Sequence, residues 1–203
     1  AKTVPEVMDF LNDLARRAKP AAQRDFEELK QFAREVHGIE RLESWDVAYY
    51  SEKLQQAKYR ISQEDLRPYF PETKVVPGLF EVVERLYGLK ISEVKGVEVW
   101  HPDVHFYEIR DGAGEVRGRF YMDLYARTHK RGGAWMDECI NRKRTVGGVQ
   151  VPVAYLVCNF TPPVGGKPAL FTHDEVITLF HEFGHGLHHM LTKMDYVGVA
   201  GIN

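Results

Sequence analysis

The sequence has little cysteine and no long apolar run, and both absences restrict its class. Its 203 residues include two cysteines, too few for the disulfide framework of a small secreted domain. We therefore expect Cys139 and Cys158 to be buried, reduced thiols in a cytoplasmic protein. No apolar stretch approaches the roughly 18 to 20 residues of a membrane-spanning helix, and no signal-peptide pattern opens the chain. We expect no membrane partner.

The sequence also lacks an excess of charge of one sign, an internal repeat and a low-complexity tract. It carries 27 basic and 29 acidic residues, which are interspersed, so its overall charge does not favour binding to nucleic acid. One cluster of Arg127, Lys130 and Arg131 beside aromatic residues is compatible with a nucleic-acid surface. Acidic residues such as Asp123 and Asp137 interrupt it, and we expect no nucleic-acid partner.

What the chain does contain is enough apolar material for a core, with 44% hydrophobic residues, and a helical period in its first part. An apolar stripe runs over residues 4–18 behind a capping box of Thr3 and Glu6. The period resumes after Pro20 and continues to Gly38, a helix-ending residue. Because proline disrupts a helix interior, we expect two helices that form a hairpin.

Further helices are expected before residue 90. They cover residues 45–59, a short segment capped by Ser62 and Asp65 that Pro68 ends or kinks, and a segment around residues 79–86 that stops at Gly88. Residues 1–90 are therefore predicted to form a helical segment.

The second part of the chain, residues 91–203, changes in character. Residues 97–100, 104–110 and 116–127 are rich in β-branched and aromatic side chains, with a glycine-containing turn at 111–114. Residues 151–160 read as another strand, and Pro152 near its start suggests the edge of a sheet. The predicted fold is α+β and mostly helical: a helical layer followed by a small antiparallel or mixed sheet.

The last predicted helix begins at Thr172, which forms a second capping box with Glu175. Its apolar residues fall on one face, and its histidines His181, His185 and His188 fall on the other. The apolar stripe consists of Val176, Phe180, Phe183, Leu187 and Met190.

The spacing of His181 and His185 predicts a zinc site. Histidines at i and i+4 lie on successive turns of one helix face, where two imidazoles can converge on one tetrahedral Zn²⁺. Glu182 lies next to both ligands, so it can act as the general base that takes a proton from a zinc-bound water as this water attacks a carbonyl.

Two alternatives remain open from the residues alone. A His-Glu-x-x-His segment can arise by chance, so the chain could be a non-enzymatic helical interaction module with a histidine-rich helix. His188 lies two turns from His181, which favours an outer or substrate-facing role over direct ligation as a third ligand. A metzincin pattern would need glycine at position 188 and is rejected, and Asp195 follows the helix too closely to fold back.

Several segments in order resemble a known family. They are residues 180–189 (Phe-His-Glu-Phe-Gly-His-Gly-Leu-His-His), the preceding residues 174–179, residues 120–127 with 130–135, residues 100–104, and residues 154–160. Together they resemble the zinc metallopeptidase family of oligopeptidase A, thimet oligopeptidase and dipeptidyl carboxypeptidase. The resemblance extends over essentially the whole chain.

The resemblance implies a larger two-lobed helical peptidase that has a deep channel and hydrolyses short peptides. It implies that the small sheet lies next to the zincin active-site helix. It implies that one Zn²⁺ is bound by His181 and His185, and that Glu182 is the base. It also implies that an edge strand near Ala154, Tyr155 and Asn159 could pair with substrate backbone. Plain core packing is an equal alternative for that strand.

In this family the third zinc ligand is a glutamate on a later helix, and the residues that stabilise the oxyanion follow it. The present sequence ends before them. We therefore expect it to be an incomplete piece of a longer enzyme, with the remaining C-terminal part supplying the glutamate and the oxyanion donors. Alone, it should bind zinc weakly and hydrolyse little.

Overall fold

A computed structural model describes residues 2–202, so Ala1 and Asn203, the ends of the expected segments 1–90 and 91–203, lie outside it. The chain divides into two compact units, Ala1–Ser62 and Gln63–Asn203. Among the residues described, no helix is both long and apolar enough to cross a lipid bilayer.

The first unit contains helices α1 (Val4–His37) and α2 (Val47–Tyr59). The hydroxyl of Thr3 caps α1 by accepting a hydrogen bond from the Glu6 backbone nitrogen, and Gly38 ends it in the left-handed conformation, at φ +67°. The Glu6 carboxylate accepts from the Lys2 backbone instead of closing the expected capping box. Leu29, Ala33 and Tyr50 form the small core between α1 and α2.

The expected hairpin at Pro20 is wrong, because α1 is one continuous helix through this residue. The apolar positions Ala15, Ala18, Ala22 and Phe26 keep spacings of three and four residues across the proline, so the same face continues on both sides. Proline removes one backbone hydrogen bond from a helix, and here the rest of the ladder persists.

The second unit begins with a short helix α3 (Gln63–Leu66), a 3-10 turn η1 (Arg67–Tyr69) and helix α4 (Glu72–Tyr87). Pro68 lies in the 3-10 turn, as predicted, and Gly88 ends α4 at φ +68°. The expected boundary near residue 90 would separate α4 from the sheet, whereas Val76, Leu79 and other α4 residues lie in the sheet's core.

A five-stranded mixed sheet occupies the centre of this unit, in the order β1-β2-β3-β7-β4. Strands β3 and β7 are parallel, and the other neighbouring pairs are antiparallel. Its strands are β1 (Lys90–Glu93), β2 (His105–Arg110), β3 (Val116–Tyr125), β4 (Trp135–Ile140) and β7 (Val153–Phe160), and β5 (Lys143–Thr145) with β6 (Gly148–Gln150) forms a separate hairpin.

Two predictions about strands are wrong. Residues 97–100 form no strand and lie in the loop between β1 and β2. Strand β7 is an interior strand rather than an edge, since β3 pairs with one side of it and β4 with the other. Pro152 precedes the first residue of β7, a position where a strand needs no backbone donor. The edge next to β7 is β4, which the sequence did not reveal.

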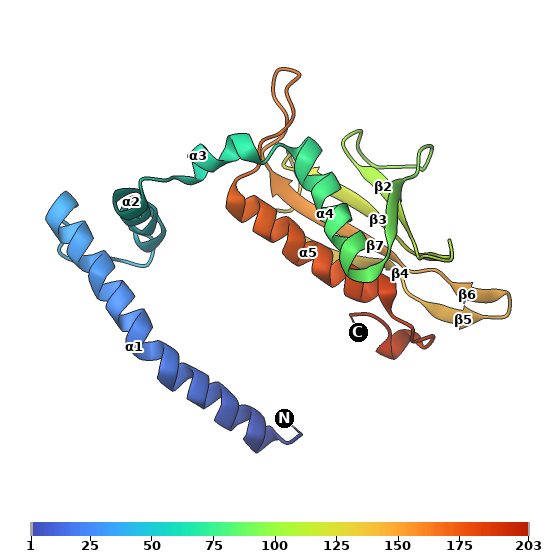
Figure 1. The fold of residues 1–203 in the computed structure, drawn as a ribbon, viewed down its shortest axis with the longest axis horizontal. Coiled ribbons are helices and arrows are strands. Elements are labelled where there is room, and N and C mark those ends of the chain that lie inside the picture. Colours follow the sequence, from blue (N-terminus) through green and yellow to red (C-terminus); the bar gives the residue numbers. More distant parts are fainter. Residues whose placement is uncertain (1, 203) are drawn as a thin grey trace. The chain divides into compact units, whose positions relative to one another are not determined.

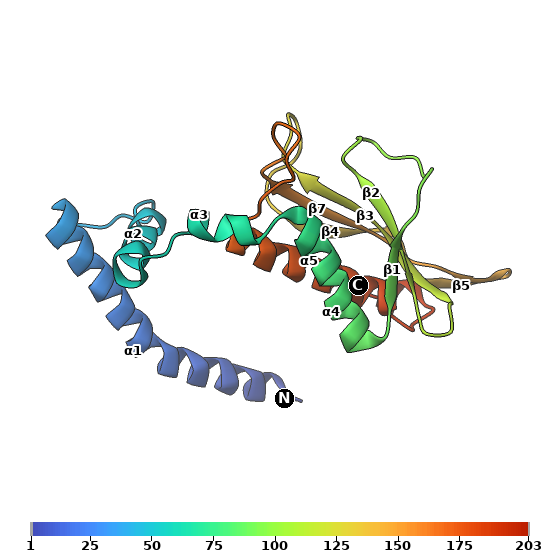
Figure 2. The same ribbon diagram turned by 45° about the horizontal axis from the view of Figure 1, so that its top comes forward.

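Helices α4 and α5 (His173–Leu191) cover the same face of the sheet (Figures 1 and 2). Their apolar side chains meet those of β3 and β7 in one core. Its largest fully buried aromatic residues are Phe120, Phe171 and Phe183. After α5 the chain forms a 3-10 turn, η2 (Val197–Val199).

Candidate metal centre

Helix α5 begins with the predicted capping box. The Thr172 backbone nitrogen donates to Glu175 Oε2 at 2.7 Å, and the Glu175 backbone nitrogen donates to Thr172 Oγ1 at 3.1 Å. These bonds satisfy two backbone donors that a helix start would leave free. They fix the residue at which α5 begins. The position of this first residue determines on which side of the helix each later side chain lies.

The two faces of α5 have different environments. Leu179, Phe183 and Met190 are at most 2% exposed and pack against the sheet. Phe180 of the predicted stripe is instead 38% exposed. His181 and His185 lie on the face directed away from the sheet and are exposed, so a metal and a substrate can reach them.

The rings of His181 and His185 converge. Their Nε2 atoms lie 3.2 Å apart, and the ring planes are almost perpendicular, at 84°. Two nitrogens that bind one tetrahedral Zn²⁺, each at about 2.0–2.1 Å, are about 3.3 Å apart. The donor pair therefore fits two positions of a zinc site.

In the part of the chain that the structure describes, the pair has no third ligand beside it. Among residues 2–202, no three histidine, cysteine or acidic side chains gather closely enough to hold a metal ion. His188 is exposed and lines a groove of about 330 Å³ together with Tyr87 of α4. Asp195 forms ion pairs with Arg142, at 3.0 Å, and with Arg144, at 2.8 Å, which agrees with its predicted exclusion from the site.

Glu182 lies on the flank of α5 that is directed toward β7. Its side chain is half-buried. Cys158, on the core face of β7, is fully buried; burial, with a contribution from the Glu182 carboxylate, raises the pKa of the Cys158 thiol to about 12. Cys158 is thus the buried thiol that the sequence predicts, and Glu182 lies between the histidine pair and the sheet.

The residues proposed from the sequence as substrate contacts on β7 are not placed together with the histidines. Ala154 is 1% exposed and its backbone pairs on both sides, so it offers a substrate neither surface nor hydrogen bonds. Tyr155 and Asn159 alternate with core residues and lie on the opposite face of the sheet. The Asn159 amide already donates to the carbonyls of Arg131 and Gly133.

The edge of the sheet near α5 is strand β4. Strand β4 pairs with β7 on one side, and no strand in residues 2–202 pairs with the other. It contacts α5. Polar and apolar residues alternate irregularly in this segment, which hid the strand from the sequence analysis. Cys139, expected to be buried, is half-buried in β4 and donates to the Tyr155 hydroxyl at 3.1 Å.

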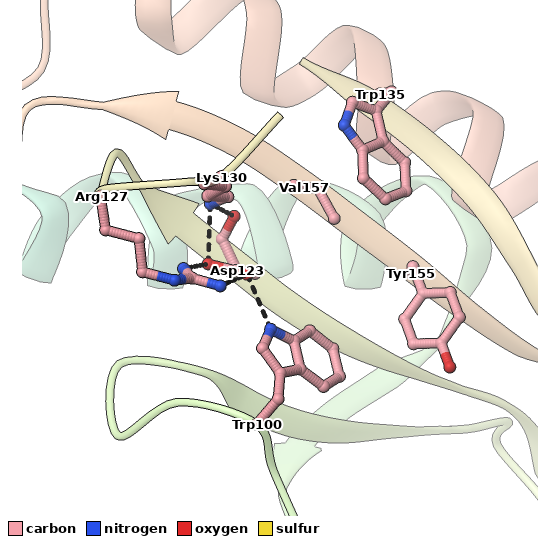
Figure 3. Close-up of a pocket in the computed structure, with 7 residues that line it drawn as sticks. All are labelled: Trp100, Asp123, Arg127, Lys130, Trp135, Tyr155 and Val157. Carbon is pink, nitrogen blue, oxygen red and sulfur yellow. Dashed lines mark hydrogen bonds and ion pairs between the residues drawn. The ribbon is translucent and has the colours of Figure 1, made fainter. Parts of the chain in front are cut away.

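A cavity of about 300 Å³ lies on the face of the sheet opposite α5 (Figure 3). Trp100, Trp135, Tyr155 and Val157 form its apolar walls. The remaining lining residues are Asp123, Arg127 and Lys130, and Asp123 forms ion pairs with the other two. Among its lining residues, the cavity therefore carries no group suited to hydrolysis. The metal centre is therefore the better candidate site, although this cavity is more enclosed by aromatic side chains.

Asp123 is 2% exposed and accepts hydrogen bonds from Arg127, Lys130 and Trp100. Burial alone would raise its pKa, but these three donors outweigh burial and lower the pKa to about 2. The Lys130 side chain is 5% exposed, so its ammonium group is paired with Asp123 away from solvent. Arg131, the third basic residue of the predicted cluster, is exposed and lies over the Trp135 ring.

Comparisons with known proteins agree with the resemblance seen in the sequence. The chain matches the description of peptidase family M3 over residues 1–203. It is 60% identical over 204 residues to oligopeptidase A of Escherichia coli (strain K12), covering 100% of this chain and 30% of that protein. The chain therefore spans about a third of the length of such relatives.

More distant relatives are similar over the same extent. Organellar oligopeptidase A of Arabidopsis thaliana is 46% identical over 98% of this chain and 26% of the relative. Dipeptidyl carboxypeptidase of Escherichia coli (strain K12) is 35% identical over 100% of this chain and 30% of the relative. These matches disfavour the alternative of a non-enzymatic interaction module.

Proposed function

Because the chain belongs to peptidase family M3, we propose that it is part of a zinc-dependent peptidase that hydrolyses short peptides. In this proposal His181 and His185 are two zinc ligands and Glu182 is the general base. The observation that carries the proposal is the 3.2 Å separation of the two Nε2 atoms on an exposed helix face, which matches the ligand spacing of one tetrahedral zinc.

Zinc bound there would polarise a water molecule and the peptide carbonyl. Glu182 precedes His185 by three residues and lies on the flank of α5 toward the sheet, next to the face that carries the two imidazoles. From there it would accept a proton from the attacking water and pass this proton to the leaving amine. Its half-buried position limits the number of waters around the carboxylate.

The side of β4 directed away from β7 is a candidate surface for the substrate backbone. The backbone of an edge strand can bind an extended peptide with little dependence on its sequence. This proposal assigns to β4 the role that the sequence suggested for residues 154–159. Support comes from the position of β4 at the edge of the sheet within residues 2–202 and from its contact with α5.

We propose that the rest of the longer protein supplies a glutamate as the third ligand and the donors that stabilise the oxyanion. The chain alone would then bind zinc weakly, because catalytic zinc sites ordinarily have three protein ligands. The two free thiols, Cys139 and Cys158, support a reducing, cytoplasmic location.

The test uses the full-length protein that contains this chain. Glu182→Gln should retain bound zinc and lower kcat for a short peptide by at least about a hundredfold, the effect of losing a general base. Glu175→Gln is the matched control, because it makes the same substitution on the same helix away from the histidines. Zinc is quantified by metal analysis and hydrolysis by peptide chromatography. Absence of bound zinc, or unchanged hydrolysis in the Glu182→Gln variant, would sink the proposal.

A further inference from the structure

His189 is a buried histidine on α5, four residues after His185, that the proposed chemistry does not use. It is 1% exposed. On an ideal helix it lies about 20° from Glu182 around the axis, so both occupy the same flank of α5. This flank is directed toward the sheet.

The ring connects α5 to the end of β4. His189 Nε2 lies 3.1 Å from the carbonyl oxygen of Ile140, the last residue of β4. A carbonyl oxygen only accepts hydrogen bonds, so Nε2 must carry the proton. The other ring nitrogen, Nδ1, is buried and has no hydrogen-bond partner among residues 2–202, which suits the unprotonated nitrogen of the same tautomer.

The chain after α5 closes over this ring. A Cβ atom on Gly201 would lie 2.9 Å from His189 Nδ1 and 3.0 Å from its Cα, and Gly201 has a left-handed backbone with φ +67°. Position 201 therefore requires glycine for two reasons, close approach and conformation. Beside it, Ala200 is 1% exposed. His189 is thus enclosed by α5, by the end of β4 and by the returning segment.

Because the ring is enclosed, its hydrogen bond to Ile140 also holds the end of β4 in place. Within residues 2–202, strand β4 pairs with one strand, β7, and it also packs against α5. A register shift near the end of β4, between Glu138 and Ile140, interrupts that pairing. The His189 hydrogen bond joins α5 to the strand at the end of this irregular stretch.

We propose that His189 is a positioning residue that fixes the edge strand β4 against the helix carrying His181, Glu182 and His185. The inference rests on the proposed function for its relevance to peptide binding. Its structural content, a bond from Nε2–H to β4, is independent of zinc and peptide. His189 would act on the substrate only through β4, so it should influence peptide binding more than the chemical step.

Two amide substitutions separate this role from general packing. The amide nitrogen of glutamine can take the place of Nε2, whereas that of asparagine corresponds to Nδ1 and does not reach Ile140. We expect His189→Gln to keep the hydrogen-exchange protection of residues 135–140. His189→Asn should accelerate exchange there by about three- to tenfold, the effect of losing one hydrogen bond, with β2 unchanged as the internal reference. Equal exchange rates of β4 in the two variants would overturn the proposal.

In the full-length protein, His189→Asn should raise KM for a short peptide by a similar factor and change kcat less than about twofold, because only uniform binding is weakened. His189→Gln should restore KM. A fall in kcat at unchanged KM would contradict a positioning role that acts through β4.

The tautomer in the unsubstituted chain decides the question if the asparagine variant does not fold. Long-range ¹H–¹⁵N spectra distinguish the two ring nitrogens, and we expect His189 to be the Nε2–H form. A ring protonated at Nδ1 alone would overturn the inference. Since these spectra require neither zinc nor hydrolysis, failure of the proposed peptidase function would be recognised separately.

Discussion

Gly118 of β3 and Met190 of α5 approach so closely that a Cβ atom on Gly118 would lie 2.5 Å from the Met190 Cβ. The two elements could not keep this separation with any other residue at position 118. Since Met190 is 1% exposed, its side chain has no free space into which it could move away from a larger residue at position 118. The contact sets the depth of the last turns of α5 on the sheet.

Substitution Gly118→Ala should therefore destabilise the protein by about 1–3 kcal/mol, the usual cost of overpacking a core. Urea unfolding monitored by tryptophan fluorescence measures this change. Gly112→Ala is the matched control in the same β2–β3 hairpin, because a Cβ there would meet no atom within 4 Å. Equal stability of the two variants would show that α5 can shift without cost.

Asp123 should make stability depend on pH below about 4. Its pKa is about 2 in the folded protein, against the ordinary value of 3.8 that applies to the unfolded chain. The contribution of Asp123 to the free energy of unfolding is therefore present above about pH 4 and is lost as pH falls toward 2. With about 1.4 kcal/mol for each pKa unit, the contribution is on the order of 2 kcal/mol.

The measurement compares the unfolding free energies of the wild-type protein and Asp123→Asn between about pH 5 and pH 2. At pH 5 the variant should be less stable by about 3 kcal/mol, because the Lys130 ammonium loses its buried partner. The difference should shrink by about 2 kcal/mol at the acidic end. A difference that stays constant with pH would show that the Asp123 pKa is not depressed.

The capping box of α5 should contribute measurably to stability. Thr172→Ala removes the oxygen that accepts from the Glu175 backbone nitrogen and should cost about 1 kcal/mol. Thr178→Ala makes the same change inside the helix, where alanine is the better helix former and no comparable loss is expected. Thermal unfolding followed by circular dichroism compares them, and similar melting temperatures would refute a role for the cap.

His188 and His185 should differ in their effect on zinc affinity. His185→Gln removes a proposed ligand and should weaken binding by more than about a hundredfold, whereas His188→Gln should weaken it less than about tenfold, as for a group outside the coordination sphere. Competition with a chromophoric chelator measures both affinities in the full-length protein. Equal losses would identify His188 as a ligand.

The sequence allowed helix ends to be predicted where a local signal defines them. Thr172 with Glu175 marked the start of α5, and Gly88 marked the end of α4, because caps and left-handed glycines act on neighbouring backbone groups. Pro20 misled the prediction for α1. There a local rule about proline was weaker than the continuous apolar face on both sides of it.

Strand pairing could not be predicted in the same way. Residues 97–100 have strand-like composition but lie beside no partner, whereas β4 has mixed composition and is paired with β7. The prediction that the strand containing Ala154 is an edge was wrong for the same reason. Which strand becomes an edge depends on contacts between residues far apart in the chain.

The convergence of His181 and His185 is the part of this protein that the sequence by itself determined. Helix hydrogen bonds join residues four apart, so the spacing of these two histidines already implies converging rings on one face. Only the tertiary structure decided which edge strand borders that helix, that Tyr155 lies on the opposite face, and that His189 joins α5 to Ile140. These relations arise from packing between distant segments, and no local spacing in the sequence encodes them.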